Sequence, residues 1–328
     1  MTTEPQELTP VELPARVIRP PTTISEAARL ALSAAAATPA VARPAPDDLE
    51  GWKHAIAQSE ALWEPVAARM LADCRCKVNT RTVGRATVYV CTPDGLEGPW
   101  RDRAYLYIHG GAFVFGGGRF AAAFGAAEAD RLGLTTFSVD YRMPPEHPFP
   151  AAPEDCLAVY RELIGHYDPR RIAIGGSSAG GNLAAATTLM IRDHGLPLPG
   201  GVILLTPEVD LTEAGDTFRT NELLDVALKR GLPECNALYA AGHALEDPYL
   251  SPLFADFARG FPPTLIQSGT RDLFLSNSVM IHRRLRHAGV PAELHVWEAM
   301  PHGGFGFGAT PENAEIGTEV RLFIDRCL

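Results

Sequence analysis

Hydrophobic runs typical of strands and patterns typical of helices take turns along most of the chain. Short apolar runs, such as "AYLYIHG" from residue 104 and "RIAIGG" from residue 171, predict buried strands. Each run is followed by a segment whose apolar positions recur every three or four residues, which predicts an amphipathic helix. Continuous apolar strands that alternate with amphipathic helices are typical of a mainly parallel sheet covered on both faces. The sequence therefore predicts an α/β fold.

Three regions depart from this alternation. Residues 1–46 are rich in Pro, Ala and Thr and contain a helical pattern that Ser25 could cap, and a second helical pattern follows from about Asp47 to Met70. Residues 74–95 alternate like two strands joined by a turn. The stretch 213–260 contains no clear strand, and we expect a mostly helical insertion there.

Composition and charge exclude several classes of protein. The formal net charge of -10 argues against a nucleic-acid partner, because neutralising phosphates requires a basic surface. No apolar run approaches the roughly 20 residues that span a bilayer. The first 16 residues lack the basic and then apolar order of a secretory signal. We expect a soluble, cytoplasmic protein that has neither a nucleic acid nor a membrane as a partner.

The segment "RIAIGGSSAGGNLA" carries the strongest chemical signal. Gly176, Ser178 and Gly180 satisfy G-x-S-x-G, whereas a frame centred on Ser177 would need glycine where Ala179 stands. A predicted strand precedes the motif and a predicted helix follows it, which is the context of a nucleophile elbow. Ser178 is therefore the candidate nucleophile, and we expect the Ser177 hydroxyl to stabilise the turn.

A serine nucleophile needs a base, which in this arrangement follows the serine and the acid along the chain. His302 lies in "EAMPHGGFGFG", just after the last predicted strand, on a loop that can reach the carboxyl edge of the sheet. Four other downstream histidines lie in the insertion, in an arginine-rich helix or within a strand: His243, His282, His287 and His295. His302 is therefore the candidate base.

The orienting acid is expected at the same edge of the sheet. Asp272 follows the penultimate strand, 30 residues before His302, and is the candidate. Asp140 and Asp210 also close strands, but one precedes the serine and the other lies one strand too early, so we interpret both as turn residues. Glu298, directly before the histidine loop, is a minor competitor.

The segment "YIHGGAFVFGGG" predicts donors for the oxyanion of acyl transfer. Gly110 and Gly111 leave a strand without side chains that could block their N–H groups, and the N–H of Ala179 would complete the oxyanion hole. His109 is expected to orient this loop by hydrogen bonding. No carboxylate–histidine spacing supports a metal site, so we expect neither a metal nor an organic cofactor.

Several motifs occur together and in a fixed order: "HGGAF" at 109–113, "DYRMPPEHPFPAAPED" at 140–155, "GSSAGG" at 176–181, "GTRDLF" at 269–274 and "MPHGGF" at 300–305. Over roughly residues 75–328 this combination resembles the hormone-sensitive-lipase-like family of α/β-hydrolases, particularly its bacterial esterases. The resemblance implies an eight-stranded, mostly parallel sheet and a helical cap. It also implies a Ser178–His302–Asp272 triad. The expected division is N-terminal cap helices over 1–72 and a catalytic domain over 73–328, with a cap insertion at about 213–248.

Four positions depart from the family pattern. Ala112 replaces a usual glycine beside the acyl pocket, and Ser177 stands where aspartate or threonine is commoner. Glu208 occupies a position that is often aromatic, which would make the pocket wall more polar. Gly304 is an extra glycine after the histidine and is expected to shift that loop. None of the four removes a reacting group.

The predicted function is hydrolysis of short- to medium-chain carboxylic esters through an acyl-enzyme on Ser178. A lactone hydrolase or an amidase could use the same triad. A non-catalytic small-molecule receptor is a further alternative, although it would predict a broken triad. The resemblance also implies a possible homodimer through the last strand.

Overall fold

The computed structural model describes residues 10–306 and 308–328, and within these ranges eight strands form one sheet. Their order is β1-β2-β4-β3-β5-β6-β7-β8. The hairpin of β1 (Cys76–Val83) and β2 (Ala86–Pro93) is antiparallel, and β2 also joins β4 antiparallel. Every later pairing is parallel. The predicted eight-stranded, mostly parallel sheet is confirmed.

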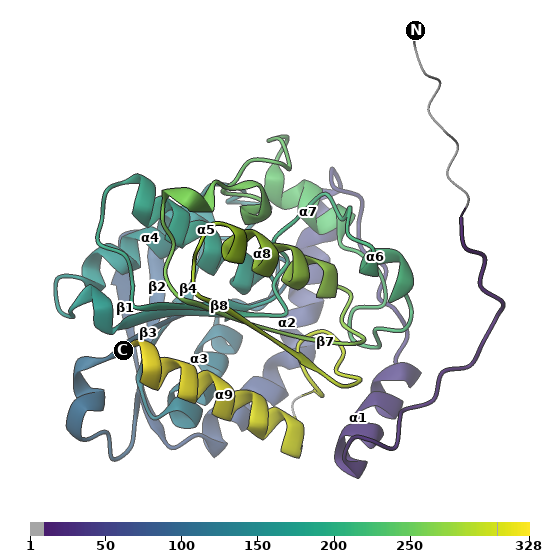
Figure 1. Cartoon of the computed structure of the whole chain (residues 1–328), viewed down its shortest axis with the longest axis horizontal. Helices are drawn as coiled ribbons and strands as arrows, with labels where there is room; N and C mark the ends of the chain where they lie inside the picture. The colour runs from purple at the N-terminus through teal and green to yellow at the C-terminus, as the bar shows by residue number, and fades with distance from the viewer. Residues whose placement is uncertain (1–9, 307) are drawn as a thin grey trace, which may run out of the picture.

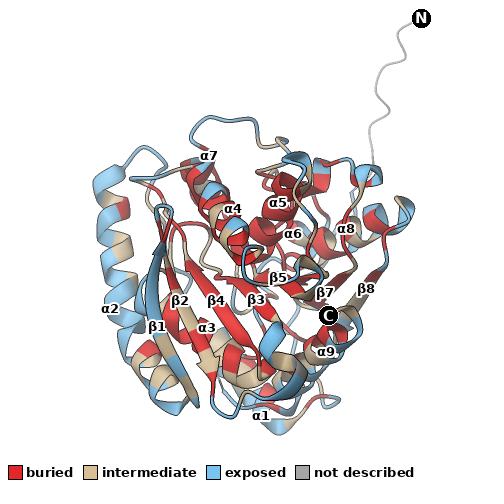
Figure 2. Cartoon of the chain, turned by 90° about the vertical axis from the view of Figure 1, so that its left-hand side faces the viewer, coloured by how far each residue is buried: buried red, intermediate tan, exposed pale blue. Residues whose placement is uncertain are grey.

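The parallel strands coincide with the apolar runs of the sequence. They are β3 (Ala104–Ile108), β4 (Thr135–Asp140), β5 (Ile172–Ser177), β6 (Gly201–Leu205), β7 (Thr264–Gly269) and β8 (Ala292–Trp297). Because the central strands are covered on both faces, they are buried along nearly their whole length, as Figure 2 shows for β3 and β4.

Helices cover the two faces of the sheet (Figure 1). One face carries α4 (Ala151–Leu163), α5 (Ala179–Asp193) and α8 (Leu275–His287), and the other carries α3 (Arg119–Leu132) and α9 (Pro311–Cys327). Leu106 and Ile108 of β3 pack in the first layer and Tyr105 and Tyr107 in the second, as the alternation of side chains along a strand requires. None of the helices in the described ranges combines the length and the apolar character needed to cross a membrane.

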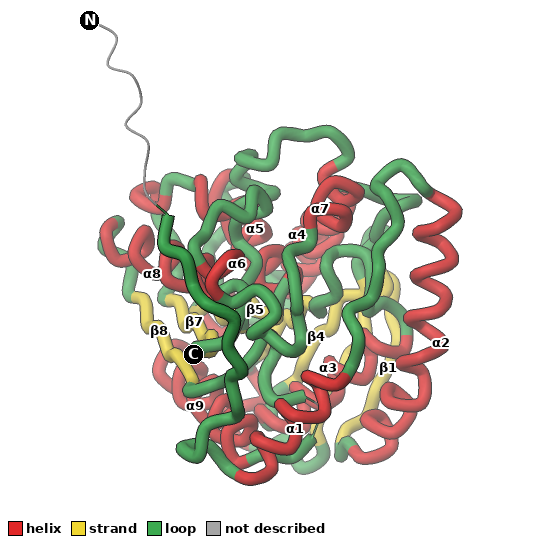
Figure 3. The backbone as a smooth tube through the Cα atoms, turned by 90° about the vertical axis from the view of Figure 1, so that its right-hand side faces the viewer, coloured by secondary structure: helices red, strands yellow, loops and turns green. Residues whose placement is uncertain are grey.

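Two N-terminal helices lie outside these layers (Figure 3). Ser25 caps α1 (Glu26–Ala37) as predicted, and its N–H and hydroxyl also donate to the Glu312 carboxylate at the start of α9. The second helix, α2 (Leu49–Asp73), lies alongside α3 and buries Trp52 completely. Residues 1–9, which form part of the segment predicted to lack a secretory signal and of the N-terminal 1–72 segment, lie outside the described residues.

The prediction of a mostly helical stretch over 213–260 is wrong. Its α-helices are the short α6 (Thr217–Thr220) and α7 (Pro233–Ala240), and turns make up most of the rest. The physical reason is visible at Asp225, whose carboxylate accepts the N–H groups of Ala227 and Leu228 and so competes with helix hydrogen bonding. Four 3₁₀ turns complete the described elements: η1 (Gly98–Asp102), η2 (Pro169–Arg171), η3 (Pro252–Phe254) and η4 (Phe257–Arg259).

Candidate active site

Ser178 lies on the sharp turn between β5 and α5. Its backbone has φ +59° and ψ -123°, a strained conformation for a residue with a side chain. The turn is held by hydrogen bonds from Ser178 N–H to the Leu205 carbonyl and from Asn182 N–H to the Ser178 carbonyl. A Cβ at Gly176 or Gly180 would lie only 2.2 or 2.0 Å from the Ile108 carbonyl oxygen. The elbow therefore needs its small residues.

Asp272 and His302 meet directly. They follow β7 and β8 respectively, and His302 Nδ1 lies 3.1 Å from Asp272 Oδ1. The other carboxylate oxygen of Asp272 accepts a 2.6 Å hydrogen bond from the Ser268 hydroxyl. Asp272 is completely buried, and the His302 ring packs edge-on against Phe274 with 4.8 Å between the ring centroids. The structure thus brings together two of the three predicted residues, which lie 30 positions apart in the sequence.

Electrostatics at this pair favour a protonated imidazole. Burial lowers the pKa of His302, but the hydrogen bond to Asp272 and the negative charges of Asp272 and Asp225 outweigh it, so the pKa is raised above its ordinary value. A buried carboxylate that accepts from Nδ1–H also fixes the tautomer, which leaves Nε2 free to accept a proton.

Ser178 shares a sheet edge with this pair. The parallel strands β5, β7 and β8 all point their carboxyl ends the same way, and the three residues follow those ends. Within residues 10–306 and 308–328 the Ser178 hydroxyl forms no hydrogen bond, including none to His302.

The loop after β3 supplies unpaired N–H groups beside the elbow. Within the described part of the chain, the N–H groups of Gly110, Gly111 and Ala179 donate no hydrogen bond. A Cβ at Gly110 would lie 3.3 Å from Ser178 Cβ, which shows how closely this loop approaches the nucleophile. Gly111 has φ +125°, and a side chain there would collide with the Phe115 carbonyl.

His109 is placed where it can hold this loop. The ring is completely buried, stacks on Tyr141 with 4.2 Å between centroids, and its Nδ1 lies 2.8 Å from the Gly110 carbonyl oxygen. Burial lowers the pKa of His109, so the ring is neutral and Nδ1–H can donate to that carbonyl. The Tyr141 hydroxyl donates to the His109 carbonyl and fixes the same turn.

The competing acids make other contacts. Asp140 Oδ2 accepts from the Tyr89 hydroxyl, and Asp210 Oδ1 accepts from both the N–H and the hydroxyl of Thr212 in a local turn. Glu298 is exposed. Of the rival histidines, His295 lies in β8 facing Glu293 and Glu319, His282 and His287 lie on α8, and His243 packs on Phe149.

The family departures have distinct structural outcomes. Ala112 takes a left-handed φ of +53°, a conformation in which glycine would be unstrained. Gly303 and Gly304 both have positive φ, and the loop then returns to α9 through a hydrogen bond from Phe305 N–H to Asn313 Oδ1. The Ser177 hydroxyl forms no hydrogen bond with the described residues, so it does not stabilise the turn in the way we expected.

Glu208 is a buried acid behind the elbow. Its N–H donates to the Ser178 carbonyl, and Oε1 accepts from the Asn236 side chain in α7. The residue is completely buried, and Oε2 has no partner within the described residues. Burial raises the pKa of Glu208 to about 8, despite the opposing hydrogen bond from Asn236.

We expect Glu208→Gln to stabilise the protein at alkaline pH. The unfolded chain releases this proton near pH 4.5 whereas the folded chain holds it up to about 8, so wild-type stability falls as pH rises between these values. The amide mimics the protonated acid, and its gain in free energy of unfolding should be on the order of a few kcal/mol larger at about pH 9 than at about pH 5. Urea denaturation at both pH values measures this difference. The exposed Glu298→Gln is the matched control, and an equal gain at both pH values for Glu208→Gln would contradict the prediction.

Sequence reasoning missed three residues around the acid and the base. Ser268 donates to Asp272, the side chain of Asn221 donates to the Asp272 carbonyl, and Asp225 accepts from the His302 N–H. Ser268 follows the strand alternation and could have been found from its place at the end of β7. Asn221 and Asp225 lie in the insertion, where no periodic pattern indicates which side chains point inward.

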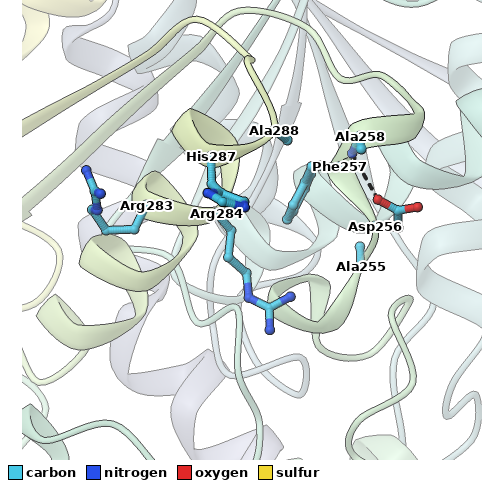
Figure 4. Close-up of a pocket in the computed structure, with 8 residues that line it drawn as sticks. All are labelled: Ala255, Asp256, Phe257, Ala258, Arg283, Arg284, His287 and Ala288. Carbon is cyan, nitrogen blue, oxygen red and sulfur yellow. Dashed lines mark hydrogen bonds between the residues drawn. The ribbon is translucent and has the colours of Figure 1, made fainter.

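A groove elsewhere on the surface contains none of these residues. It has a volume of about 570 Å³ and lies between α8 and residues 255–258 (Figure 4). Its basic wall is formed by Arg283, Arg284 and His287. The catalytic candidates lie at the carboxyl edge of the sheet instead.

Comparison with known proteins agrees with this geometry. The profile of the family described as alpha/beta hydrolase fold matches residues 105–306. The acetyl-hydrolase of Streptomyces hygroscopicus is 34% identical over 226 residues, which cover 67% of this chain and 73% of that protein. The crystal structure of esterase E25 has a TM-score of 0.90 at 32% identity and covers 97% of this chain and 99% of its own. For an esterase from the bacterial hormone-sensitive lipase family, the TM-score is 0.78 at 32% identity, over 92% of this chain and 98% of that one. The chain therefore belongs to the α/β-hydrolase fold family, and within it to the hormone-sensitive-lipase-like carboxylic ester hydrolases.

Proposed function

We propose that this ester hydrolase uses Ser178 as its nucleophile and proceeds through an acyl-enzyme. The observation that carries the proposal is the hydrogen-bonded Asp272–His302 pair, which lies at the sheet edge where Ser178 is raised on a strained turn. A serine hydroxyl is activated by a base that takes its proton, and the base is oriented by an acid.

Each residue has a defined role in the proposed reaction. Ser178 Oγ attacks the ester carbonyl carbon while His302 Nε2 takes the hydroxyl proton, and Asp272 stabilises the imidazolium. The N–H groups of Gly110, Gly111 and Ala179 receive the oxyanion. The intermediate then expels the alcohol, which takes its proton from His302. Water, activated by the same imidazole, releases the acid and restores the serine.

We also propose that the described part of the N-terminal segment, residues 10–72, and the insertion at about 213–248 form a cap that shapes an apolar acyl site. An apolar cluster joins Trp52 of α2 to Phe218 and Leu238 of the insertion, and Phe115 of the loop after β3 packs against it. We expect this apolar site to accept short to medium acyl chains, which agrees with the name of the Streptomyces acetyl-hydrolase. The homodimer through β8 and the cytoplasmic location stay predictions.

A serine-directed probe tests the nucleophile and the acyl preference together. We expect a fluorophosphonate to label Ser178 alone, as identified by mass spectrometry of the labelled peptide. Excess p-nitrophenyl butyrate should slow the labelling more than p-nitrophenyl dodecanoate does at the same concentration. Ser178→Ala should abolish labelling and Ser177→Ala should retain it. Labelling at Ser177, or an unlabelled protein that still hydrolyses the butyrate ester, would overturn the proposal.

A further inference from the structure

A second carboxylate, Asp225, lies beside the acid and the base. It comes from the insertion between α6 and α7 and is completely buried. One ligating atom each of Asp225, Asp272 and His302 lies within 4.8 Å of the others. The reaction proposed above assigns no role to this third group, although a buried carboxylate is costly unless its oxygens are satisfied.

Hydrogen bonds account for the position of Asp225. Its Oδ2 accepts from the backbone N–H of Leu273 at 2.8 Å and of His302 at 3.1 Å. These N–H groups belong to the loops that carry the acid and the base. Its Oδ1 accepts from Ala227 and Leu228 at 3.0 Å each, which fixes the carboxylate in its own turn. One side chain therefore connects three separate loops.

Asn221 strengthens the same connection. Its side-chain amide donates to the carbonyls of Asp272 and Thr270, and its own carbonyl accepts from the Asp225 N–H. One turn of the insertion thus contacts the loop of Asp272 through the Asn221 amide. The Asp225 carboxylate of the same turn contacts both this loop and the loop of His302. The carbonyls and N–H groups that it contacts are backbone atoms, so it fixes the course of the loops rather than particular side chains.

A cation site does not explain the cluster. Asp272 Oδ1 already accepts from Phe274 N–H and faces His302 Nδ1, and its Oδ2 accepts from Ser268. Both oxygens of Asp225 accept two N–H groups each. The carboxylate lone pairs are therefore committed to hydrogen bonds within the protein.

We propose that Asp225 is a positioning residue, which holds the backbone of the acid and base loops in register and whose negative charge supports the protonated state of His302. This inference rests on the proposed function, because it assigns Asp225 a part in the work of the same Ser178–His302–Asp272 site. Asp225 acts through His302 and does not touch the reacting atoms.

The charges around Asp225 give the sign of its effect. The ionisable groups of the described chain that act on it at short range are His302 and Asp272, from the loops after β8 and β7. Burial raises the pKa of Asp225 to about 6, with the His302 charge opposing this shift, so the carboxylate is charged at pH 8. The negative charges of Asp225 and Asp272 both raise the pKa of His302. Removing the Asp225 charge therefore lowers the pKa of His302 and lets the imidazole remain a free base at lower pH.

The test is the pH profile of Asp225→Asn with p-nitrophenyl butyrate. We expect kcat to fall by about tenfold or more, because the loops of Asp272 and His302 lose their relative positions. KM should change less than about twofold. The acid limb of kcat/KM, which reports the free enzyme's base, should move to lower pH by about half a unit or more. Asp210→Asn is the matched control: it removes another buried carboxylate that accepts a backbone N–H, and its acid limb should stay in place.

The outcomes separate this inference from the function on which it rests. An inactive wild-type protein would overturn the function. An active wild type with an Asp225→Asn variant that is folded, by circular dichroism, and keeps the wild-type acid limb would overturn the role of Asp225 alone. If Asp225→Asn does not fold, Asp225→Glu decides, because it keeps the charge: the acid limb must then stay at the wild-type pH while kcat falls, and a shifted limb contradicts the inference.

Discussion

Replacing Ser178 with alanine should lower kcat/KM for p-nitrophenyl butyrate by about 10⁴-fold or more, because the residual rate comes only from binding and the oxyanion donors. The fold should not change. Alanine also carries a Cβ, so it bears the same strain at φ +59°, and the backbone hydrogen bonds that hold the elbow do not use the hydroxyl. Steady-state kinetics together with thermal unfolding measure the two effects.

Ser177→Ala is the control for this experiment. It removes a hydroxyl from the adjacent position, the last residue of β5, and that hydroxyl makes no hydrogen bond with the described residues. Its turnover should stay within a few-fold of wild type. If the two variants behaved in the opposite way, Ser177 would be the nucleophile and the G-x-S-x-G frame would be misread.

His302→Ala should cause a loss of similar size, about 10⁴-fold in kcat, because the variant lacks the imidazole that we propose takes the serine proton. The raised pKa of His302 places the acid limb of the wild-type profile above the ordinary histidine value. This limb should vanish from the residual activity of the variant, which should instead rise steadily with hydroxide concentration. Initial rates between about pH 5 and about pH 9 measure it.

His287→Ala is the matched control, since it removes an exposed histidine from α8 at the groove of Figure 4. Both its rate and its acid limb should match wild type. An acid limb that persists in His302→Ala would mean that another group titrates, and the assignment of the base would be wrong.

The strands and main helices could be predicted because burial on both faces leaves a direct mark on the sequence. A central strand such as β3, "AYLYI", must be apolar at every position, and α5 must begin with small residues to pass the Ile108 carbonyl. The insertion could not be predicted in this way. Its turns are set by side-chain hydrogen bonds such as those of Asp225, and no periodic pattern of apolar residues indicates which of its side chains point inward.

In the candidate site too, the residues at strand ends could be predicted and those of the insertion could not. Asp272 and His302 could be proposed because each follows a strand, and the topology of a parallel sheet brings strand ends to one edge. Asp225 could not, because its partners lie 48 and 77 positions away and are backbone atoms that any residue would supply. No residue type at positions 273 or 302 indicates that an N–H there needs a buried acceptor.

The position of Trp52 limits how far the enzyme can be truncated. This tryptophan belongs to α2, yet it shares an apolar cluster with Phe274, the aromatic neighbour of His302. A truncated protein limited to the family-matched residues 105–306 would lack Trp52, which would leave a cavity in that cluster. The packing of Phe274 against the His302 ring would then be less well supported. Because α2 supplies this packing, we expect that engineered variants need to retain it.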